Sequence, residues 1–322
     1  MQANRLRSIV LVVLASAAAG AAQTAAPAAG PEGTPYEALI TPGANYDKAE
    51  FRLWLPAGAG TVRAVVVLVP GSNGDGRPMA DDPVWRDFAA RRGLALMACR
   101  FTDKPHDQNF IEEYAAVSRG SGQALLDALA GLGDRAGHPE LGGVPLFLWG
   151  MSAGGQFNYE FTAWKPERVA AFVVNKGGIY YTALVSKAAR EVPALLFTGE
   201  KDLAFRSDTI AGLFAVNRRA GALWAIVQEP GIAHAVGRSV EMSLIFFDEI
   251  LPLRIAATGS DASSPAGLRP LSEKSGFIGD PVSKTIQAVE KSGVPNRPTA
   301  WLPTGRAARA WLAVVTGNPF DR

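Results

Sequence analysis

The stretch Gly150-Met151-Ser152-Ala153-Gly154 has the residue types and spacing of a serine nucleophile held on a sharp turn. It directly follows the apolar run 144–149 and precedes a segment of helical character. Such a turn crowds the positions two before and two after the serine, and glycine at both positions relieves that crowding. The start of the helix would direct free N–H groups toward a developing oxyanion. The pentapeptide predicts nucleophilic catalysis at Ser152, although a chain with 34 glycines also produces this pattern by chance.

A serine hydroxyl needs a general base within hydrogen-bond reach, and the chain offers three histidines. His234 follows the predicted strand 225–228, which brings it to the same edge of the sheet as Ser152. His106 follows another predicted strand and also reaches that edge, so it is the alternative base or a residue of the substrate cleft. His138 precedes the strand that carries the serine and belongs at the opposite edge. The placement therefore favours His234.

The base in turn needs a carboxylate that fixes its tautomer and stabilises the imidazolium. Glu200 and Asp202 both lie just past the end of the predicted strand 194–198. Asp202 is the preferred partner because the turn at Gly199 leads the chain back toward the histidine loop. Glu200 is the alternative.

Alternating strands and helices must position these residues. The β-branched run 62–69 is typical of a strand that is covered on both faces, whereas 50–55 alternates like a half-buried strand. Further strands are predicted at 94–100, 146–149, 169–174, 194–198 and 225–228, and helices at 84–92, 110–132, 153–164, 208–220 and 238–251. This order predicts an α/β fold with a doubly wound, mostly parallel sheet and a site at the carboxyl ends of its strands.

Composition and the two ends of the chain limit the function further. A formal charge of +2 over 322 residues, without a basic cluster, argues against nucleic acid as a partner. The single cysteine, Cys99, excludes an intramolecular disulfide and a cysteine-based metal site. Residues 1–22 are interpreted as a signal peptide, because a basic start precedes an apolar stretch too short to span a bilayer and then small residues. The mature protein is therefore expected to be secreted or periplasmic, with no membrane span.

The rest of the chain is expected to form one domain with an appendage. Residues 23–35, rich in Ala, Pro and Gly, are interpreted as a flexible leader, and residues 36–251 as the catalytic domain. Residues 252–322 change character, with frequent Ser, Gly and Pro and one predicted helix at 306–315. We expect them to form a C-terminal extension that packs on the catalytic domain.

The chain order Ser152, Asp202, His234 resembles that of the α/β-hydrolase-fold serine esterases, over residues 51–251. Within that superfamily, the motif at 150–155 and the compact spacing are similar to the secreted feruloyl and acetylxylan esterases, the polyhydroxyalkanoate depolymerases and the dienelactone-hydrolase-like proteins. The resemblance implies an α/β-hydrolase fold and hydrolysis of carboxylic esters through an acyl-enzyme, with no cofactor and no metal.

The resemblance also implies an oxyanion hole. One amide would come from Ala153, and the second from the loop after the strand 62–69, where many members carry His-Gly. This chain has Pro70-Gly71 instead, as do the cutinase-like polyester hydrolases, which points to Ser72 as the second donor and Asn73 as the alternative.

Three further residues are candidates to line a substrate pocket: Tyr180 and Tyr181, which follow a strand end, and His106. If the protein is secreted, its ester substrate is expected to be a polymer or a fragment of one, such as a hemicellulose ester or a polyester. Two other interpretations remain open at this point. A serine peptidase of the same fold has the same chain order, and a non-catalytic binding module of this fold would lack one member of the triad.

Overall fold

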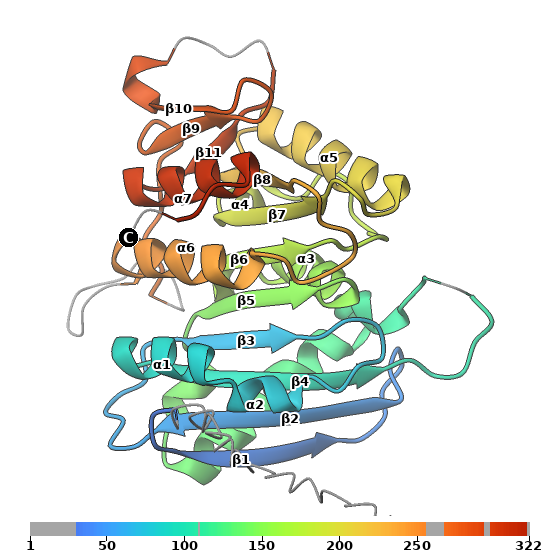
Figure 1. Cartoon of the computed structure of the whole chain (residues 1–322). Helices are drawn as coiled ribbons and strands as arrows, with labels where there is room; N and C mark the ends of the chain where they lie inside the picture. Colours follow the sequence, from blue (N-terminus) through green and yellow to red (C-terminus); the bar gives the residue numbers. More distant parts are fainter. Residues whose placement is uncertain (1–29, 109, 256–266, 293–296, 321–322) are drawn as a thin grey trace, which may run out of the picture.

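The computed structural model describes residues 30–108, 110–255, 267–292 and 297–320; the expected signal peptide lies outside them. An eight-stranded sheet with the order β1-β2-β4-β3-β5-β6-β7-β8 forms the centre of the molecule (Figure 1). Its strands are β1 (Gly33–Ile40), β2 (Lys48–Pro56), β3 (Val65–Val69), β4 (Ala95–Thr102), β5 (Leu146–Met151), β6 (Val169–Asn175), β7 (Ala194–Gly199) and β8 (Trp224–Glu229). From β4 to β8 in this order all neighbours run parallel, and β2 runs antiparallel to both β1 and β4.

Helices cover both faces of the sheet. The face that carries Val65, Val67 and Val69 packs against α2 (Ser121–Ala136), α3 (Ala153–Trp164), α4 (Lys187–Arg190) and α5 (Ala204–Arg219). The face that carries Val66 and Leu68 packs against α1 (Pro83–Arg92), α6 (Ser239–Arg254) and α7 (Gly305–Thr316). Because side chains alternate along a strand, the continuous apolar runs supply both cores at once. The doubly wound α/β architecture is therefore confirmed.

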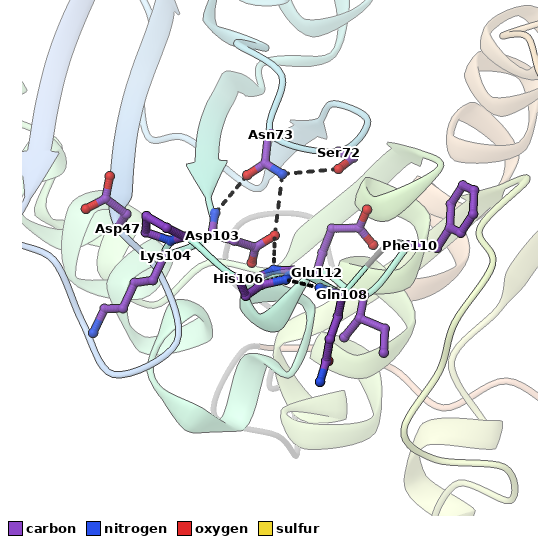
Figure 2. Close-up of a pocket in the computed structure, with 11 residues that line it drawn as sticks. Asp47, Ser72, Asn73, Asp103, Lys104, His106, Gln108, Phe110 and Glu112 are labelled. Carbon is purple, nitrogen blue, oxygen red and sulfur yellow. Dashed lines mark hydrogen bonds and ion pairs between the residues drawn. The ribbon is translucent and has the colours of Figure 1, made fainter.

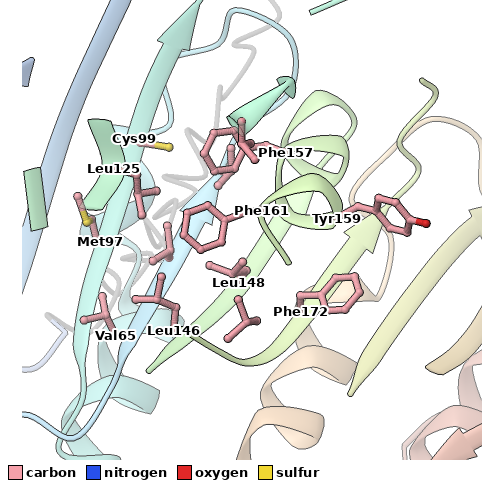
Figure 3. Packing of buried hydrophobic residues seen from close by; sticks show 14 of the residues in the cluster. Val65, Met97, Cys99, Leu125, Leu146, Leu148, Phe157, Tyr159, Phe161 and Phe172 are labelled. Atoms are coloured by element: carbon pink, nitrogen blue, oxygen red, sulfur yellow. The ribbon is translucent and has the colours of Figure 1, made fainter. Parts of the chain in front are cut away.

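The core on the face that carries Val65 shows how the fold holds the turn between β5 and α3. Figure 3 shows Phe157 and Phe161 of α3 among Leu146 and Leu148 of β5, all of them fully buried. The aromatic side chains anchor the helix on the strand that immediately precedes it. The turn between β5 and α3 is therefore fixed from both sides by apolar burial.

The predicted helices at 208–220 and 238–251 differ by up to four residues from Ala204–Arg219 and Ser239–Arg254, and one helix differs far more. The expected helix at 110–132 begins only at Ser121, and residues 113–115 and 117–119 form short 3-10 turns instead. The Asn45 side chain causes the difference, because it donates to the carbonyls of Glu113 at 2.9 Å and Ala116 at 3.0 Å. These carbonyls are satisfied from a distant loop, and the α-helix starts after them.

The expected leader, 23–35, also needs correction at its end. Strand β1 begins at Gly33 and pairs antiparallel with β2, from Gly33 opposite Pro56 to Ile40 opposite Ala49. Pro35 lies within it and is tolerated because this is the edge strand of the sheet. Any leader therefore ends before residue 33.

The described part of the C-terminal segment packs beside β8 (Figure 1). It forms a small sheet of order β10-β9-β11, from β9 (Phe277–Asp280), β10 (Thr285–Ala288) and β11 (Ala300–Leu302), followed by α7 where a helix was predicted. Buried Trp311 donates its indole N–H to the Ile226 carbonyl at 2.7 Å. The expected boundary at residue 251 falls inside α6, so the extension shares a helix and a core with the main domain. Over the described part of the chain, no helix has the length and apolarity needed to cross a membrane.

Candidate active site

Ser152 lies on the turn between β5 and α3 with φ 53° and ψ −120°, a conformation that non-glycine residues rarely adopt. Its amide donates to the Asn175 carbonyl of the neighbouring β6 at 2.7 Å. A Cβ at Gly154 would overlap the carbonyls of Val69 and Pro70, and one at Gly150 would overlap Gly154 itself. The turn therefore requires glycine at both motif positions.

The structure brings Ser152, Asp202 and His234 into one hydrogen-bonded chain. Ser152 Oγ lies 3.0 Å from His234 Nε2, and His234 Nδ1 lies 2.9 Å from Asp202 Oδ2. Asp202 follows β7 and His234 follows β8, so the ends of parallel strands supply both residues. The side chain of Asp202 is 1% exposed and that of His234 is 32% exposed, which leaves the imidazole accessible to a substrate.

The environment of Asp202 favours the charged carboxylate. Burial alone would raise its pKa, but hydrogen bonds with His234, the Leu203 amide and Arg206 hold the pKa below its ordinary value. The Leu203 amide and Arg206 Nη1 reach Oδ1 at 2.7 and 3.0 Å. The carboxylate can therefore stabilise an imidazolium while keeping its own orientation.

The alternative acid and bases have other partners. Glu200 accepts a hydrogen bond from the Gly231 amide at 2.5 Å and so holds the loop that carries His234. His138 lies 2.9 Å from Glu140, at the other edge of the sheet. His106 lies 3.6 Å from Asp103 and accepts the Gln108 amide. Asp202 and His234 are the pair that reaches the serine.

The loop after β3 runs directly alongside the serine. A Cβ at Gly71 would lie 3.6 Å from Ser152 Cβ. The Asn73 amide already donates to Tyr114 Oη at 3.2 Å, which favours Ser72 over Asn73 as the second oxyanion donor. Ala153 is the first residue of α3, so its amide has no intrahelical acceptor.

A cavity of about 430 Å³ opens beside Ser72 (Figure 2). It is lined by Asp47, Ser72, Asn73, Asp103, Lys104, Pro105, His106, Gln108, Phe110, Ile111 and Glu112. Of the three residues expected in a substrate pocket, His106 lines the same cavity as Ser72. Glu112 was not predicted as a site residue, because nothing in the local sequence distinguishes it from other loop acids.

The two tyrosines lie elsewhere, which corrects the expectation for them. Tyr180 packs its ring against Tyr159, with ring centroids 5.0 Å apart, within the core. Tyr181 borders a separate cavity of about 400 Å³ together with Glu160 and Trp164. Tyr181 nevertheless contacts one residue of the cavity beside Ser72, because its hydroxyl donates to the carbonyl of Glu112 at 3.2 Å.

Lys176 is a fully buried lysine that was not predicted as a site residue, and it lies next to the residues that hold the triad. The side chains of Lys176 and Glu229 are 0% and 2% exposed and form an ion pair. Lys176 Nζ also donates to Asn175 Oδ1 at 2.9 Å, and Asn175 is the residue whose carbonyl accepts the Ser152 amide. Lys176 has a positive φ of 59°, so tertiary contacts hold it in an uncommon conformation.

This buried pair also holds the loop that carries His234. Asn175 Nδ2 donates to the Val236 carbonyl at 3.1 Å, and Glu229 Oε1 accepts the Arg238 amide at 2.6 Å. Both contacts lie just beyond His234 in the chain. One network therefore fixes the serine turn and the histidine loop relative to each other.

Lys176→Met is accordingly expected to lower kcat by about 10²-fold, with little change in KM, because the network aligns the triad without touching a substrate. It should also destabilise the fold by about 3–5 kcal/mol, since Glu229 is left as a buried unpaired charge. Adding Glu229→Gln should restore most of the stability but only part of kcat. Steady-state kinetics and thermal unfolding of the single and double variants provide the check. Recovery of kcat in step with stability would show that the pair is merely structural.

No protein-family profile matches this sequence, and no curated protein matches it significantly. Among solved structures, the poly(3-hydroxybutyrate) depolymerase LpqC from Bordetella parapertussis is similar, with a TM-score of 0.51 and 18% identity over 71% of this chain and 92% of that chain. Poly(aspartic acid) hydrolase-1 from Sphingomonas sp. KT-1 aligns with a TM-score of 0.47 and 16% identity, over 64% of this chain and 94% of that one. A Pyrobaculum calidifontis esterase aligns with a TM-score of 0.47 and 17% identity, over 69% of this chain and 86% of that one. The strand order, the turn at Ser152 and the likeness to the first of these structures together show that the chain has the α/β-hydrolase fold.

Proposed function

We propose that this protein is a serine hydrolase that cleaves carboxylic esters through an acyl-enzyme on Ser152. The observation that carries the proposal is the hydrogen-bonded chain from Ser152 Oγ through His234 to the buried Asp202. A strained serine with a positive φ at the end of a parallel strand supports it, because strain of this kind is concentrated at functional sites. The similarity to LpqC, a depolymerase of a polyester, agrees with this choice of substrate bond.

The proposed reaction proceeds in two steps. His234 takes the proton of Ser152 as the serine attacks the ester carbonyl, and then gives that proton to the leaving alcohol. Water, activated by His234, then releases the acid. Asp202 holds the imidazole throughout, and the amides of Ala153 and Ser72 bind the oxyanion. None of these steps needs a cofactor or a metal.

The basic and apolar start of the sequence, residues 1–22, supports a further part of the proposal, that the enzyme acts outside the cytoplasm. An ester within a polymer, or a fragment of one, is the substrate class that such a location makes accessible. Secretion would be tested by fractionating cells that express the full chain and sequencing the N-terminus of the exported product.

The first experiment is to incubate the protein with a fluorophosphonate, locate the label by peptide mass, and assay p-nitrophenyl acetate and butyrate in parallel. Labelling at Ser152 with ester turnover is expected. Labelling without ester turnover would favour the peptidase of the same fold, for which peptide amides would then be assayed. Absence of labelling would favour a non-catalytic binding module.

The oxyanion assignment leads to a matched pair of variants. Ser72→Pro removes the backbone N–H and should lower kcat by about 10²–10³-fold, the usual cost of one oxyanion donor. Ser72→Ala keeps that N–H and should lose less than about tenfold. Kinetics on p-nitrophenyl butyrate, with circular dichroism to confirm folding, test the pair. Equal losses in both variants would assign the effect to the hydroxyl rather than the amide.

A further inference from the structure

The cavity beside Ser72 lies on one particular side of the serine. In the sheet order, β3 and β4 lie on one side of β5, whereas β7 and β8 lie on the other. Ser72 and Asp103 follow β3 and β4, and His234 follows β8. In the proposed reaction His234 must protonate the leaving oxygen, so the leaving alcohol lies on the β8 side. The cavity, which we call the acyl pocket, is therefore on the side of the acyl group.

The lining of the acyl pocket is polar, and two of its carboxylates are withdrawn from water. Figure 2 shows Asp103 and Glu112 in the lining. The side chain of Asp103 is 6% exposed, and Glu112 as a whole is 7% exposed. Burial raises the pKa of both carboxyls. Among the described residues of the lining, the apolar side chains are those of Pro105, Phe110 and Ile111. The pocket thus offers polar side chains, two buried carboxylates among them, rather than a hydrocarbon surface.

Glu112 connects the acyl pocket to the catalytic turn. Its Oε2 lies 3.2 Å from the Gln156 side-chain nitrogen, in the amide orientation that satisfies both ends of Gln156. Gln156 belongs to α3, one turn after Ser152. Hydrogen bonding with the Ser72 side chain also acts on the Glu112 carboxyl. A group bound at Glu112 therefore lies beside the oxyanion loop and beside α3, the helix that follows Ser152.

Both carboxylate oxygens of Asp103 already have protein partners, so Asp103 can accept fewer hydrogen bonds from a ligand than Glu112 can. One of its oxygens accepts the Tyr114 amide at 3.2 Å, and the other lies 3.4 Å from Asn73 Nδ2 and 3.6 Å from His106 Nε2. Its negative charge nevertheless acts on Glu112 and raises the cost of leaving the Glu112 carboxylate without a donor. A saturated chain in this pocket would displace water from Glu112 without replacing the lost hydrogen bonds.

We propose that the acyl pocket selects acyl groups that carry a hydrogen-bond donor, a hydroxyl or an ammonium, which donates to Glu112. This inference rests on the proposed ester hydrolysis and adds to it the chemical class of the acyl group. A hydroxyl supplies one donor, and an ammonium supplies several and offsets the negative charge of the carboxylates.

Three methyl esters of equal length test the proposal: butanoate, 3-hydroxypropanoate and 3-aminopropanoate, which end in a methyl, a hydroxyl and an ammonium group. At least one donor ester is expected to exceed butanoate in kcat/KM by about tenfold or more, the value of a hydrogen bond to a charged group. The order of the hydroxyl and ammonium esters identifies which donor the pocket prefers. Butanoate as the best of the three would overturn the proposal.

Two matched variants assign the preference to one side chain. Glu112→Gln keeps the size of the side chain and removes its charge, so the advantage of the preferred donor ester over butanoate should fall about tenfold for an ammonium and less for a hydroxyl. Glu160→Gln is the control. Glu160 is also 7% exposed with a pKa raised by burial, but it binds Tyr181 and Thr182 and borders the other cavity. An unchanged ratio in Glu112→Gln, or an equal drop in Glu160→Gln, would contradict the assignment.

Binding to Ser152→Ala separates this inference from the proposed function. In calorimetric titrations, the preferred donor ester should bind this variant more tightly than butanoate, and Glu112→Gln in the same background should reduce the difference, more for an ammonium than for a hydroxyl. If wild-type protein hydrolyses none of the esters but this binding order holds, the proposed function fails and the pocket chemistry stands. If hydrolysis occurs and butanoate binds equally well, the pocket inference alone fails.

Discussion

Replacing Ser152 with alanine is expected to lower kcat on p-nitrophenyl butyrate by a factor of about 10⁶, because no other group on the turn can form the acyl-enzyme. His234 would keep its contact with Asp202, but it would have no proton to take from a nucleophile. Some acceleration over water should persist from the oxyanion amides and from substrate binding. Stopped assays with high enzyme concentration would measure this residual rate.

Folding provides the control for that variant. Ser152 Oγ has His234 as its side-chain partner, and alanine tolerates the positive φ no better and no worse than serine. The melting temperature of Ser152→Ala should therefore stay close to that of the wild type, while fluorophosphonate labelling disappears. Turnover near the wild-type level would remove Ser152 from the mechanism.

Asp202→Asn should produce the second-largest loss, a fall in kcat of about 10⁴-fold. An amide at this position can donate to His234 Nδ1, which leaves the imidazole in the tautomer that cannot accept the serine proton. The amide also cannot stabilise the imidazolium. Glu200→Gln is the matched control, because Glu200 lies just past the same strand but holds the Gly231 amide rather than the imidazole. Its loss should be much smaller, and a reversed order of the two variants would make Glu200 the acid.

The charge state of Asp202 gives this prediction a pH dependence. Its pKa lies below the ordinary carboxyl value, so the contacts with His234 and Arg206 stabilise the fold above that range, and this stability is lost as the pH falls through the lowered pKa. The carboxylate therefore stays ionised in mild acid. The free energy of unfolding of the wild type should exceed that of Asp202→Asn by a margin that does not shrink between neutral and mildly acidic pH, and a margin that collapses in mild acid would contradict the lowered pKa.

Most of the sheet could be predicted because its strands carry their own signals. Parallel strands covered on both faces are continuous apolar runs, and 62–69 and 169–174 show this directly. The edge strand β1 was missed because it is half-exposed, contains Pro35 and depends on pairing with β2 for its conformation. The start of α2 was misplaced for a related reason, since a side chain from a distant loop, Asn45, satisfies the carbonyls that a longer helix would have used.

The sequence by itself determined the serine turn and the candidates that reach it. The glycines at 150 and 154, and the positions of Asp202 and His234 after strands, are local features, because parallel strands all end at the same edge. Only the tertiary structure decided which acid contacts the imidazole, and that Tyr180 lies in the core rather than at the cavity. It alone placed Glu112 beside Ser72 and buried Lys176 against Glu229. Burial and pairing between residues far apart in the chain depend on how loops pack, and such packing leaves no period or motif in the sequence.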